Sequence, residues 1–316
     1  MKAFNHKNAK TLAEAKTALA GGNTVLIAGG TDLIGQLKDN ILPTYPAELV
    51  NIKTITPALD YIKEGAGMLR IGATTRLADI AANPAVNKNY TALAQAALRV
   101  ATPHVRDMGT IGGNIAQLHR CWYFRKPENR FPCTRKGGKQ CFAMTGDNRY
   151  HSIFGVVKGC LAVHPSDIAP ALIALNAKIV TTTRTVPAEG FFDVNFPGNT
   201  VLAPGEIITE IQVPAPPAGA KSAFLKFAIR KSIDFPIVNC AVLAGGGTAR
   251  IALNAVAPKP YRATKAEAAI AGKTINEATA EAAGAAAVED AKPLPATKYK
   301  VQIAKTLVKR ALLATV

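Results

Sequence analysis

The stretch TVLIAGGTDL, residues 24–33, decides the fold of the N-terminal part of this chain. Its apolar run, residues 24–28, has the length and composition of a short buried strand, and the run ends at Gly29 and Gly30. A Thr-Asp pair then leads into the expected start of a helix. Paired glycines let main-chain N–H groups approach a phosphate without an intervening Cβ atom. The stretch therefore predicts a strand, a tight turn with a candidate phosphate site, and a helix.

A second glycine pair, Gly112 and Gly113, lies in the sequence TIGGNI, residues 110–115. We expect the same order of strand, glycine turn and polar side chain here, with Asn114 as an additional donor. Neither pair has the spacing of a GxGxxG or a Walker loop, so a plain tight turn between strands is the alternative for each. Two such turns in one domain favour a pyrophosphate ligand that is held from two sides.

Around these turns, short strands alternate with helices, which indicates mixed α/β organisation up to about residue 210. The expected strands are 24–28, 48–52, 68–72 and 206–213, and the expected helices are 11–20, 75–83 with Thr75 as its N-cap, and 91–101, followed by a helix and a strand within 168–180. The run PAPPAG, residues 214–219, predicts a stiff linker and a domain boundary.

Beyond the linker, strands and helices occur in separate blocks. The expected strands are 223–230, 237–244 and 250–256, and the expected helices are 263–271, 275–289 and 300–313. Such segregation predicts an α+β domain with a meander sheet. We therefore expect an α+β chain of two domains, residues 1–218 and 219–316.

The composition is that of a folded protein, because 48% of the 316 residues are hydrophobic and 19% are charged. No apolar run reaches the roughly 18 residues that a membrane-spanning helix needs. Lys10, Glu14 and Lys16 interrupt the N-terminal stretch where a signal peptide has an unbroken apolar block. We expect no membrane insertion, no signal peptide, and a cytoplasmic location, or a periplasmic one by co-export with a partner that carries a signal.

The formal net charge is +17, from 38 basic and 21 acidic residues. Spare Lys and Arg residues commonly neutralise phosphates, so nucleic acid is the first candidate partner. However, nine of the basic residues lie between Arg120 and Cys160, where the only acidic residues are Glu128 and Asp147. Four of the five cysteines fall in this window. The local charge suggests an anionic group among the cysteines.

These four cysteines, Cys121, Cys133, Cys141 and Cys160, are separated by 11, 7 and 18 residues in a stretch without periodicity. We expect a long inserted loop, and a loop of this length is usually functional or disordered. No CxxC pair occurs, which weakens the interpretation as a zinc site. Two disulfides, unrelated buried cysteines and a 4Fe–4S cluster remain as alternatives. Cys240, inside a strand pattern, is expected in the core.

Three motifs carry a resemblance to a known family: AGGTDL at 28–33, TIGGNIA at 110–116 and HPSDIAPAL at 164–172. They resemble the flavin-binding subunit of the molybdenum hydroxylases, which include xanthine dehydrogenase, carbon monoxide dehydrogenase, 4-hydroxybenzoyl-CoA reductase and the periplasmic aldehyde oxidoreductase. The resemblance covers nearly the whole chain. It implies a two-subdomain FAD-binding domain of the PCMH type over 1–218 and a C-terminal flavoprotein domain over 219–316.

The resemblance also implies what the cysteine insertion, residues 119–162, does. Its pattern is most like the aldehyde oxidoreductase branch, in which such an insertion carries a 4Fe–4S cluster, here on Cys121, Cys133, Cys141 and Cys160. The implied function is that of an FAD and 4Fe–4S electron-transfer subunit of a heterotrimeric molybdenum-containing aldehyde oxidoreductase. The implied partners are a large molybdopterin-binding catalytic subunit and a small 2Fe–2S ferredoxin-like subunit, with an external electron acceptor.

Two alternative functions are kept. One is the flavin subunit of an enzyme like 4-hydroxybenzoyl-CoA reductase, in which electrons run the other way. The other is a basic nucleic-acid-binding protein with a zinc-stabilised loop, which leaves both glycine pairs without a role. Because aromatic residues make up only 6% of the chain, we expect no nucleic acid partner. No catalytic acid–base residues are evident, as fits an oxidoreductase subunit that transfers electrons.

The family's cofactor-binding residues carry over onto matching positions of this chain. They are Leu26, Ile27, Ala28, Gly29, Gly30, Thr31, Asp32, Leu33, Thr110, Ile111, Gly112, Gly113, Asn114, Asp167, Ile207 and Lys226. The resemblance places the FAD pyrophosphate on the first motif and Lys226 near the flavin ring, with Ile207 or Ile208 packed against that ring. Without the family, Asp167 is an ordinary helix N-terminal carboxylate and Lys226 an edge-strand lysine.

Asp32 departs from the family, whose members often carry an uncharged polar residue there. A carboxylate beside a pyrophosphate is unfavourable, so we expect its side chain to point away or to cap the following helix. The histidines are assigned smaller roles. His104 and His164 are expected to be structural, whereas His119 and His151 border the cysteine insertion and are placed to tune a cluster.

Overall fold

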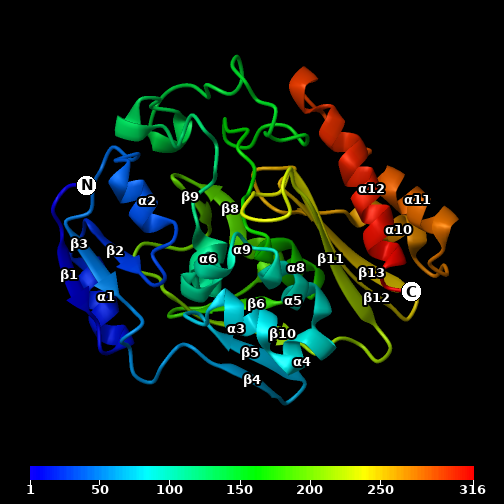
Figure 1. Ribbon diagram of the computed structural model, residues 1–316, viewed down its shortest axis with the longest axis horizontal. Helices are drawn as coiled ribbons and strands as arrows, with labels where there is room; N and C mark the ends of the chain where they lie inside the picture. The colour runs from blue at the N-terminus through cyan, green and yellow to red at the C-terminus, as the bar shows by residue number, and fades with distance from the viewer.

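In the computed structural model, which describes all 316 residues, the N-terminal pattern forms a small parallel sheet (Figure 1). Its strands are ordered β1 (Asn5–Asn8), β3 (Glu48–Asn51) and β2 (Thr24–Ile27). Helix α1 (Leu12–Ala20) begins after Thr11, whose hydroxyl accepts the Glu14 N–H. Helix α2 (Leu33–Lys38) follows β2, so the first motif is a strand, a glycine turn and a helix as the sequence predicts.

A second, antiparallel sheet lies beside it. Its order is β4 (Ile62–Gly65), β5 (Met68–Gly72), β10 (Ile208–Pro214), β6 (Lys178–Thr181) and β7 (Thr185–Pro187). The helices of this part are α3 (Leu77–Ala82), α4 (Pro84–Asn89), α5 (Thr91–Leu98), α6 (Pro103–Met108), α7 (Ile111–Ala116) and α8 (Ile168–Ala174), of which α7 contacts β10. Helix α9 (Ala188–Phe191) leads into the hairpin of β8 (Phe192–Asn195) and β9 (Gly198–Thr200). The largest core, 33 buried residues, lies between these elements and the third sheet.

The third sheet is the meander expected from the sequence. Strands β11 (Lys221–Phe227), β12 (Val238–Gly245), β13 (Thr248–Asn254) and β14 (Tyr261–Arg262) pair antiparallel in chain order. Helices α10 (Thr264–Ile270), α11 (Glu277–Ala286) and α12 (Tyr299–Leu313) cover one face, and α5 and α8 approach the other. The predicted α+β class is confirmed. No helix of the protein combines the length and apolar character needed to cross a bilayer.

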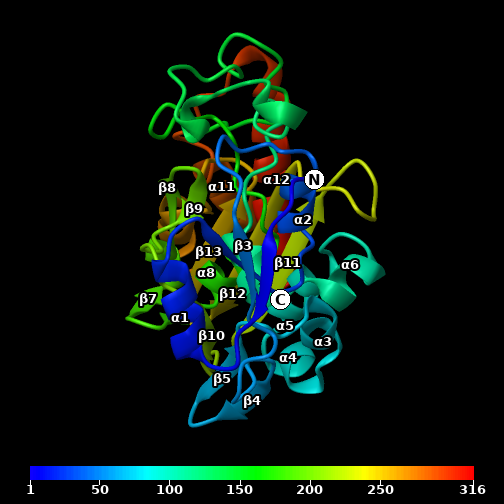
Figure 2. The same ribbon diagram turned by 90° about the vertical axis from the view of Figure 1, so that its left-hand side faces the viewer.

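The cysteine segment, residues 119–162, has almost no regular structure, as its lack of periodicity predicts. It contains two short 3₁₀ turns, η1 (Pro127–Asn129) and η2 (Thr134–Lys136). A third 3₁₀ turn, η3 (Pro295–Thr297), lies outside it, before α12. The segment spans the top of the molecule between α2 and α12 (Figures 1 and 2). At the α2 side the Glu128 N–H donates to Asp39, and at the α12 side the Tyr299 hydroxyl donates to Arg149.

Two local predictions are wrong. The second glycine pair does not form a turn after a strand, because Gly112 and Gly113 lie inside α7. The hydroxyl of Thr110 accepts the Gly113 N–H at 3.2 Å and so caps this short helix. Thr75 is not an N-cap either, because its hydroxyl donates to the Tyr61 carbonyl and the helix begins two residues later.

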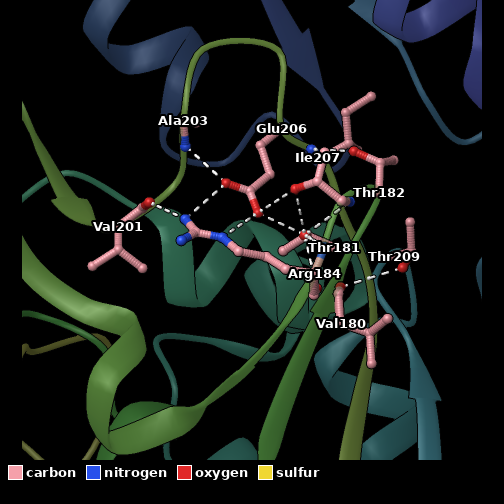
Figure 3. A network of polar contacts seen from close by, with 10 residues as sticks. Val180, Thr181, Thr182, Arg184, Val201, Ala203, Glu206, Ile207 and Thr209 are labelled. Atoms are coloured by element: carbon pink, nitrogen blue, oxygen red, sulfur yellow. Dashed lines mark hydrogen bonds and ion pairs between the residues drawn. The ribbon is translucent and has the colours of Figure 1, made fainter.

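A buried carboxylate fastens the β6–β7 turn to the segment before β10 (Figure 3). Glu206 accepts hydrogen bonds from Arg184 Nε at 2.9 Å, from the hydroxyl of Thr181 at 2.6 Å and from the Ala203 N–H at 2.8 Å. Chiefly through the Arg184 contact, its pKa falls from 4.5 to about 2. The network therefore ties the turn between β6 and β7 to residues 203 and 206.

Candidate functional site

A cavity of about 670 Å³ opens next to the first glycine motif. All eight predicted residues of this motif, 26–33, line it. Of the second motif, residues 110–116, Thr110, Gly113, Asn114 and Ala116 do, whereas Ile111 and Gly112 do not. Residues 40–42 and 44–46, which follow α2, and residues 233–235, in the loop between β11 and β12, also line it. The structure therefore brings both predicted motifs to one cavity.

The glycines of the two motifs have different roles from the one expected. A Cβ atom on Gly29 would lie 2.0 Å from the Met108 carbonyl oxygen, and one on Gly112 would lie 2.8 Å from that of Ala73. These two glycines thus allow protein main chains to approach each other, not a ligand. Gly30 has a φ of +71°, a left-handed conformation that glycine adopts without strain.

The two motifs also differ in the hydrogen bonding of their main-chain N–H groups. Those of residues 29–32 have no acceptor within the chain, although they follow one another at the cavity. In the second motif, by contrast, the N–H groups of Ile111, Gly112, Gly113 and Asn114 all bond to protein oxygens. A run of free N–H groups is the donor set that suits a phosphate. Only the first motif offers one, so the second contributes through its side chains.

Asp167 and Lys226 meet at the cavity wall although they come from different domains. Lys226 Nζ lies 2.7 Å from an Asp167 carboxylate oxygen, and both side chains are 4% exposed. The amide of Asn239 donates to the other carboxylate oxygen at 2.6 Å. Burial raises the pKa of Asp167, and the adjacent Lys226 opposes this rise.

This pairing corrects both simple interpretations of the two residues. Asp167 does not cap α8 with its side chain, because the Ser166 hydroxyl accepts the Ala169 N–H instead. Lys226 is on an edge strand but is not solvated there, since it also donates to the carbonyl of Arg99 at 3.0 Å. Together they present a buried ion pair to the cavity.

Asp32 neither caps α2 nor points to the solvent. One carboxylate oxygen lies 2.9 Å from Arg120 and 2.9 Å from Arg125, and the other accepts the Leu118 N–H at 3.0 Å and the amide of Gln36 at 2.8 Å. The first glycine motif is therefore tied to the start of the cysteine segment. These contacts agree with the expectation that the carboxylate of Asp32 points away from the phosphate region. The sequence does not predict which residues Asp32 contacts.

Ile207 and Ile208 do not line the cavity. Ile207 is 1% exposed and belongs to a small apolar cluster behind β2, and Ile208 is part of the main core. Their expected packing against a flavin ring is not what this structure shows. The cavity instead exposes Val100, Val105 and Phe235, which lie in short helices or loops without a sequence signal.

Comparison with known families decides what this cavity belongs to. The family model described as FAD binding domain in molybdopterin dehydrogenase matches residues 2–216, and the one described as CO dehydrogenase flavoprotein C-terminal domain matches residues 223–315. The chain belongs to the FAD-binding subunits of the molybdenum hydroxylases. The resemblance drawn from the three motifs is thereby confirmed, and with it the assignment to an oxidoreductase subunit.

Individual relatives of this flavin subunit agree. The chain is 36% identical, over 85% of its length and 86% of the relative's, to the aldehyde oxidoreductase FAD-binding subunit PaoB of Escherichia coli (strain K12). It is 31% identical to the carbon monoxide dehydrogenase medium chain of Hydrogenophaga pseudoflava, covering 98% and 96% of the two chains. A solved structure of that enzyme superposes with a TM-score of 0.77 over 99% of this chain and 97% of that one.

The cysteine segment of the flavin subunit gathers its thiols. Burial, and more weakly the neighbouring Cys160 and Cys133 thiols, raise the pKa of Cys121 to about 12. Burial also raises the pKa of Cys133, again with contributions from Cys160 and Cys141. All four predicted residues are thus electrostatic neighbours, and none forms a disulfide. Cys240 is fully buried in β12 away from them, as expected.

Two of these sulfurs have polar partners. Cys160 accepts a hydrogen bond from Arg135 Nε at 3.0 Å and another from the Ala162 N–H at 3.3 Å. The ring nitrogen Nε2 of His151 lies 3.2 Å from the sulfur of Cys121. Of the other histidines, His119 and His164 are buried without a hydrogen-bond partner, the latter against the ring of Phe192.

Buried cations surround the segment. Arg135, Lys136 and Lys300 are 1%, 7% and 0% exposed, and no carboxylate pairs with any of them. Lys136 donates to the carbonyls of Ile41 and Phe124, and Lys300 to those of His151 and Ala255. Burial lowers the pKa of Lys300 to about 7.

The side chains are not arranged for a single metal ion. No group of three or more His, Cys, Asp or Glu side chains lies close enough to hold one. A four-iron cluster makes a different demand, because each thiolate binds a separate iron and the sulfurs stand farther apart than the ligands of one ion.

Proposed function

We propose that this chain is the FAD and 4Fe–4S electron-transfer subunit of a heterotrimeric molybdenum-containing aldehyde oxidoreductase. The observation that carries the proposal is the run of free main-chain N–H groups at residues 29–32. These residues line a cavity of about 670 Å³ beside the cysteine segment. The likeness to a relative whose name states aldehyde oxidation favours the aldehyde class among the family's substrates.

The cavity suits FAD in both size and donors. The N–H groups of residues 29–32 are available for the pyrophosphate, and the Thr110 hydroxyl and Asn114 amide stand at the same cavity. Lys226 and Asp167 form a buried ion pair where the C-terminal domain meets the cavity. Bound FAD exchanges electrons singly or in pairs, and the protein supplies its position and its electrostatic surroundings.

A 4Fe–4S cluster on Cys121, Cys133, Cys141 and Cys160 suits the cysteine segment. Four thiolates give such a site net negative charge, and the buried Arg135 and Lys136 carry positive charge without carboxylate partners. Arg135 already donates to one of the four sulfurs. A hydrogen bond or a charge near a sulfur tunes the potential of a cluster, and that is the role we assign to Arg135 and His151.

The remaining redox groups belong to partners. We assign the oxidation of the aldehyde to a large molybdopterin-binding subunit and the intermediate electron transfer to a small 2Fe–2S subunit. This chain then converts between one-electron and two-electron carriers and delivers electrons to an external acceptor. The excess of basic residues favours acidic partner surfaces.

Anaerobic purification with measurement of iron, acid-labile sulfide and FAD tests the proposal. We expect about four irons per chain and one FAD. Cys133→Ser should lose most of the iron and keep FAD, whereas Cys240→Ser, a matched change of a buried cysteine outside the segment, should keep both. Absence of iron from the unmodified chain would refute the cluster, and absence of FAD would refute the cavity assignment.

A further inference from the structure

A second cavity of about 460 Å³ lies beside the first. Its lining is Arg120, Cys121, Trp122, Tyr150, His151, Ala162, Val163, Ile229, Arg230, Asp234, Phe235, Pro236 and Ile237. These residues come from the cysteine segment, from Val163 directly after it, and from the loop between β11 and β12, which projects in yellow in Figure 2. The cavity thus lies where the two domains meet at the thiol-rich end of the molecule.

The two cavities share a wall. Arg120, Asp234 and Phe235 line both of them. The guanidinium of Arg120 lies over the Phe235 ring at 4.6 Å from its centroid, and this stacked pair separates the two spaces. Cys121 lines only the second cavity. A molecule in the second cavity would therefore contact a proposed cluster ligand on one side and the wall of the flavin cavity on the other.

The lining is both aromatic and cationic. Trp122 and Tyr150 stand edge to face with ring centroids 5.5 Å apart, and Phe235 adds a third ring. Aromatic walls favour a flat, unsaturated ligand. Arg120 and Arg230 are the cations, and the one carboxylate, Asp234, is engaged by Arg230 at 2.5 Å. The volume is in the range of small-molecule sites, about 300–1,000 Å³.

We infer that the second cavity binds a planar quinone as the external electron acceptor. Flat rings between the aromatic walls match this class, as do oxygen atoms that accept from the guanidinium N–H groups of Arg120 and Arg230 not engaged by Asp32 and Asp234. The inference rests on the proposed function, because the electrons come from the cluster beside Cys121. Two electrons would reach the quinone one at a time through the cluster, which reduced FAD would re-reduce between the two transfers. Two protons from solvent would complete the hydroquinone, and the flavin and the cluster would both end oxidised.

The binding test uses the only tryptophan of the chain as its probe. Trp122 lines the cavity, so a naphthoquinone sulfonate bound there should quench the tryptophan fluorescence of the purified full chain. Val163 lines the second cavity and not the first. Val163→Phe should fill part of the space and raise the dissociation constant at least about tenfold. Val156→Phe, an exposed change in the same segment that lines neither cavity, should not.

A charge test is independent of packing. Arg230→Gln should weaken binding of the anionic probe about fivefold. The expected effect is this modest because the Arg230 side chain is 70% exposed and solvent screens its charge. Arg149→Gln is the matched control, because Arg149 also pairs with a nearby carboxylate, Asp147, and lines neither cavity. Equal effects of the two changes would overturn the assignment of Arg230. Both side chains are exposed, so neither variant should fail to fold.

The redox arm follows cluster reoxidation after photoreduced chain is mixed with the probe. We expect Val163→Phe to slow the probe-dependent return of the iron–sulfur absorbance while Val156→Phe leaves it unchanged. No quenching, or quenching that Val163→Phe does not alter in a chain with intact FAD and circular dichroism, would overturn the inference. Saturable quenching in a chain that holds no iron would support the binding site and refute the cluster instead.

Discussion

Asp32→Asn tests whether one carboxylate couples the cavity loop to the cysteine segment. The side chain lies between the guanidinium groups of Arg120 and Arg125, each 2.9 Å away. Asparagine has nearly the same shape and keeps an acceptor for the Leu118 N–H, so the change removes the charge and little else. Two half-buried arginines then face each other without compensation.

The magnitude follows from exposure. The side chain of Asp32 is 15% exposed, and those of Arg120 and Arg125 are 28% and 18% exposed. Breaking a fully buried pair costs about 3–5 kcal/mol and an exposed one about 0–1 kcal/mol, so two intermediate pairs suggest a loss of about 2–3 kcal/mol. For a chain of this size that corresponds to a fall of about 5 °C in the melting temperature.

Differential scanning calorimetry of the FAD-loaded chain measures this, and retained flavin is read from the same samples after gel filtration. Asp39→Asn is the control, because Asp39 ends the same helix and its side chain makes no hydrogen bond or ion pair. We expect Asp32→Asn to lower both the melting temperature and the FAD content. If the two variants melt within about 1 °C of each other, the proposed coupling is wrong.

Three other changes address the cavity and the fold. Gly29→Ala places a Cβ atom 2.0 Å from a main-chain carbonyl oxygen. It should reduce FAD retention and destabilise the chain by about 1–3 kcal/mol in urea unfolding. Gly35→Ala, inside α2 and in open space, should keep FAD and stabilise the chain by about 0.5–1 kcal/mol. Lys226→Met leaves a buried carboxylate unpaired and should cost about 3–5 kcal/mol; adding Asp167→Leu should recover stability but not FAD affinity, and full recovery of both would refute a role in binding. Because the pKa of Glu206 is lowered from 4.5 to about 2, its contribution is complete above pH 4.5 and is lost as the pH falls toward 2. Glu206→Gln should therefore be less stable than the unmodified chain by about 2–3 kcal/mol at pH 7, and the difference should shrink with acid.

The local elements were predictable from the sequence because their signals are local. Alternating apolar residues and turn residues place the strands of the third sheet within three residues of the bounds of β11, β12 and β13. The lack of periodicity in residues 121–159 corresponds to a segment without strands or α-helices. Prediction failed for α7, where two glycines suggested a turn and a capping threonine with tertiary contacts stabilises a helix.

The site was predictable as a set of segments but not as a set of contacts. The glycine motifs, Asp167 and Lys226 all line one cavity, yet no sequence pattern says that the last two form an ion pair across the domain boundary. The same holds for Asp32, whose partners in the cysteine segment, Arg120 and Arg125, are 88 and 93 residues later in the chain. Such contacts depend on how separate elements pack, and periodicity carries no information about that packing.

The charge of the chain gains a local explanation from the cysteine segment. A buried cation without a counter-ion costs several kcal/mol, because carbonyl dipoles replace water only in part. Arg135 and Lys136 are buried cations of this kind within the segment. Lys300 is a third, at the edge of the segment, and burial lowers the pKa of Lys300 to about 7. A cluster whose four thiolates give it net negative charge would offset the cost for Arg135, which donates to Cys160, and for Lys136, which lies near Cys133 and Cys121. Replacing Lys136 with methionine should then stabilise the iron-free chain and destabilise the iron-loaded one, and the same sign in both would refute this electrostatic account.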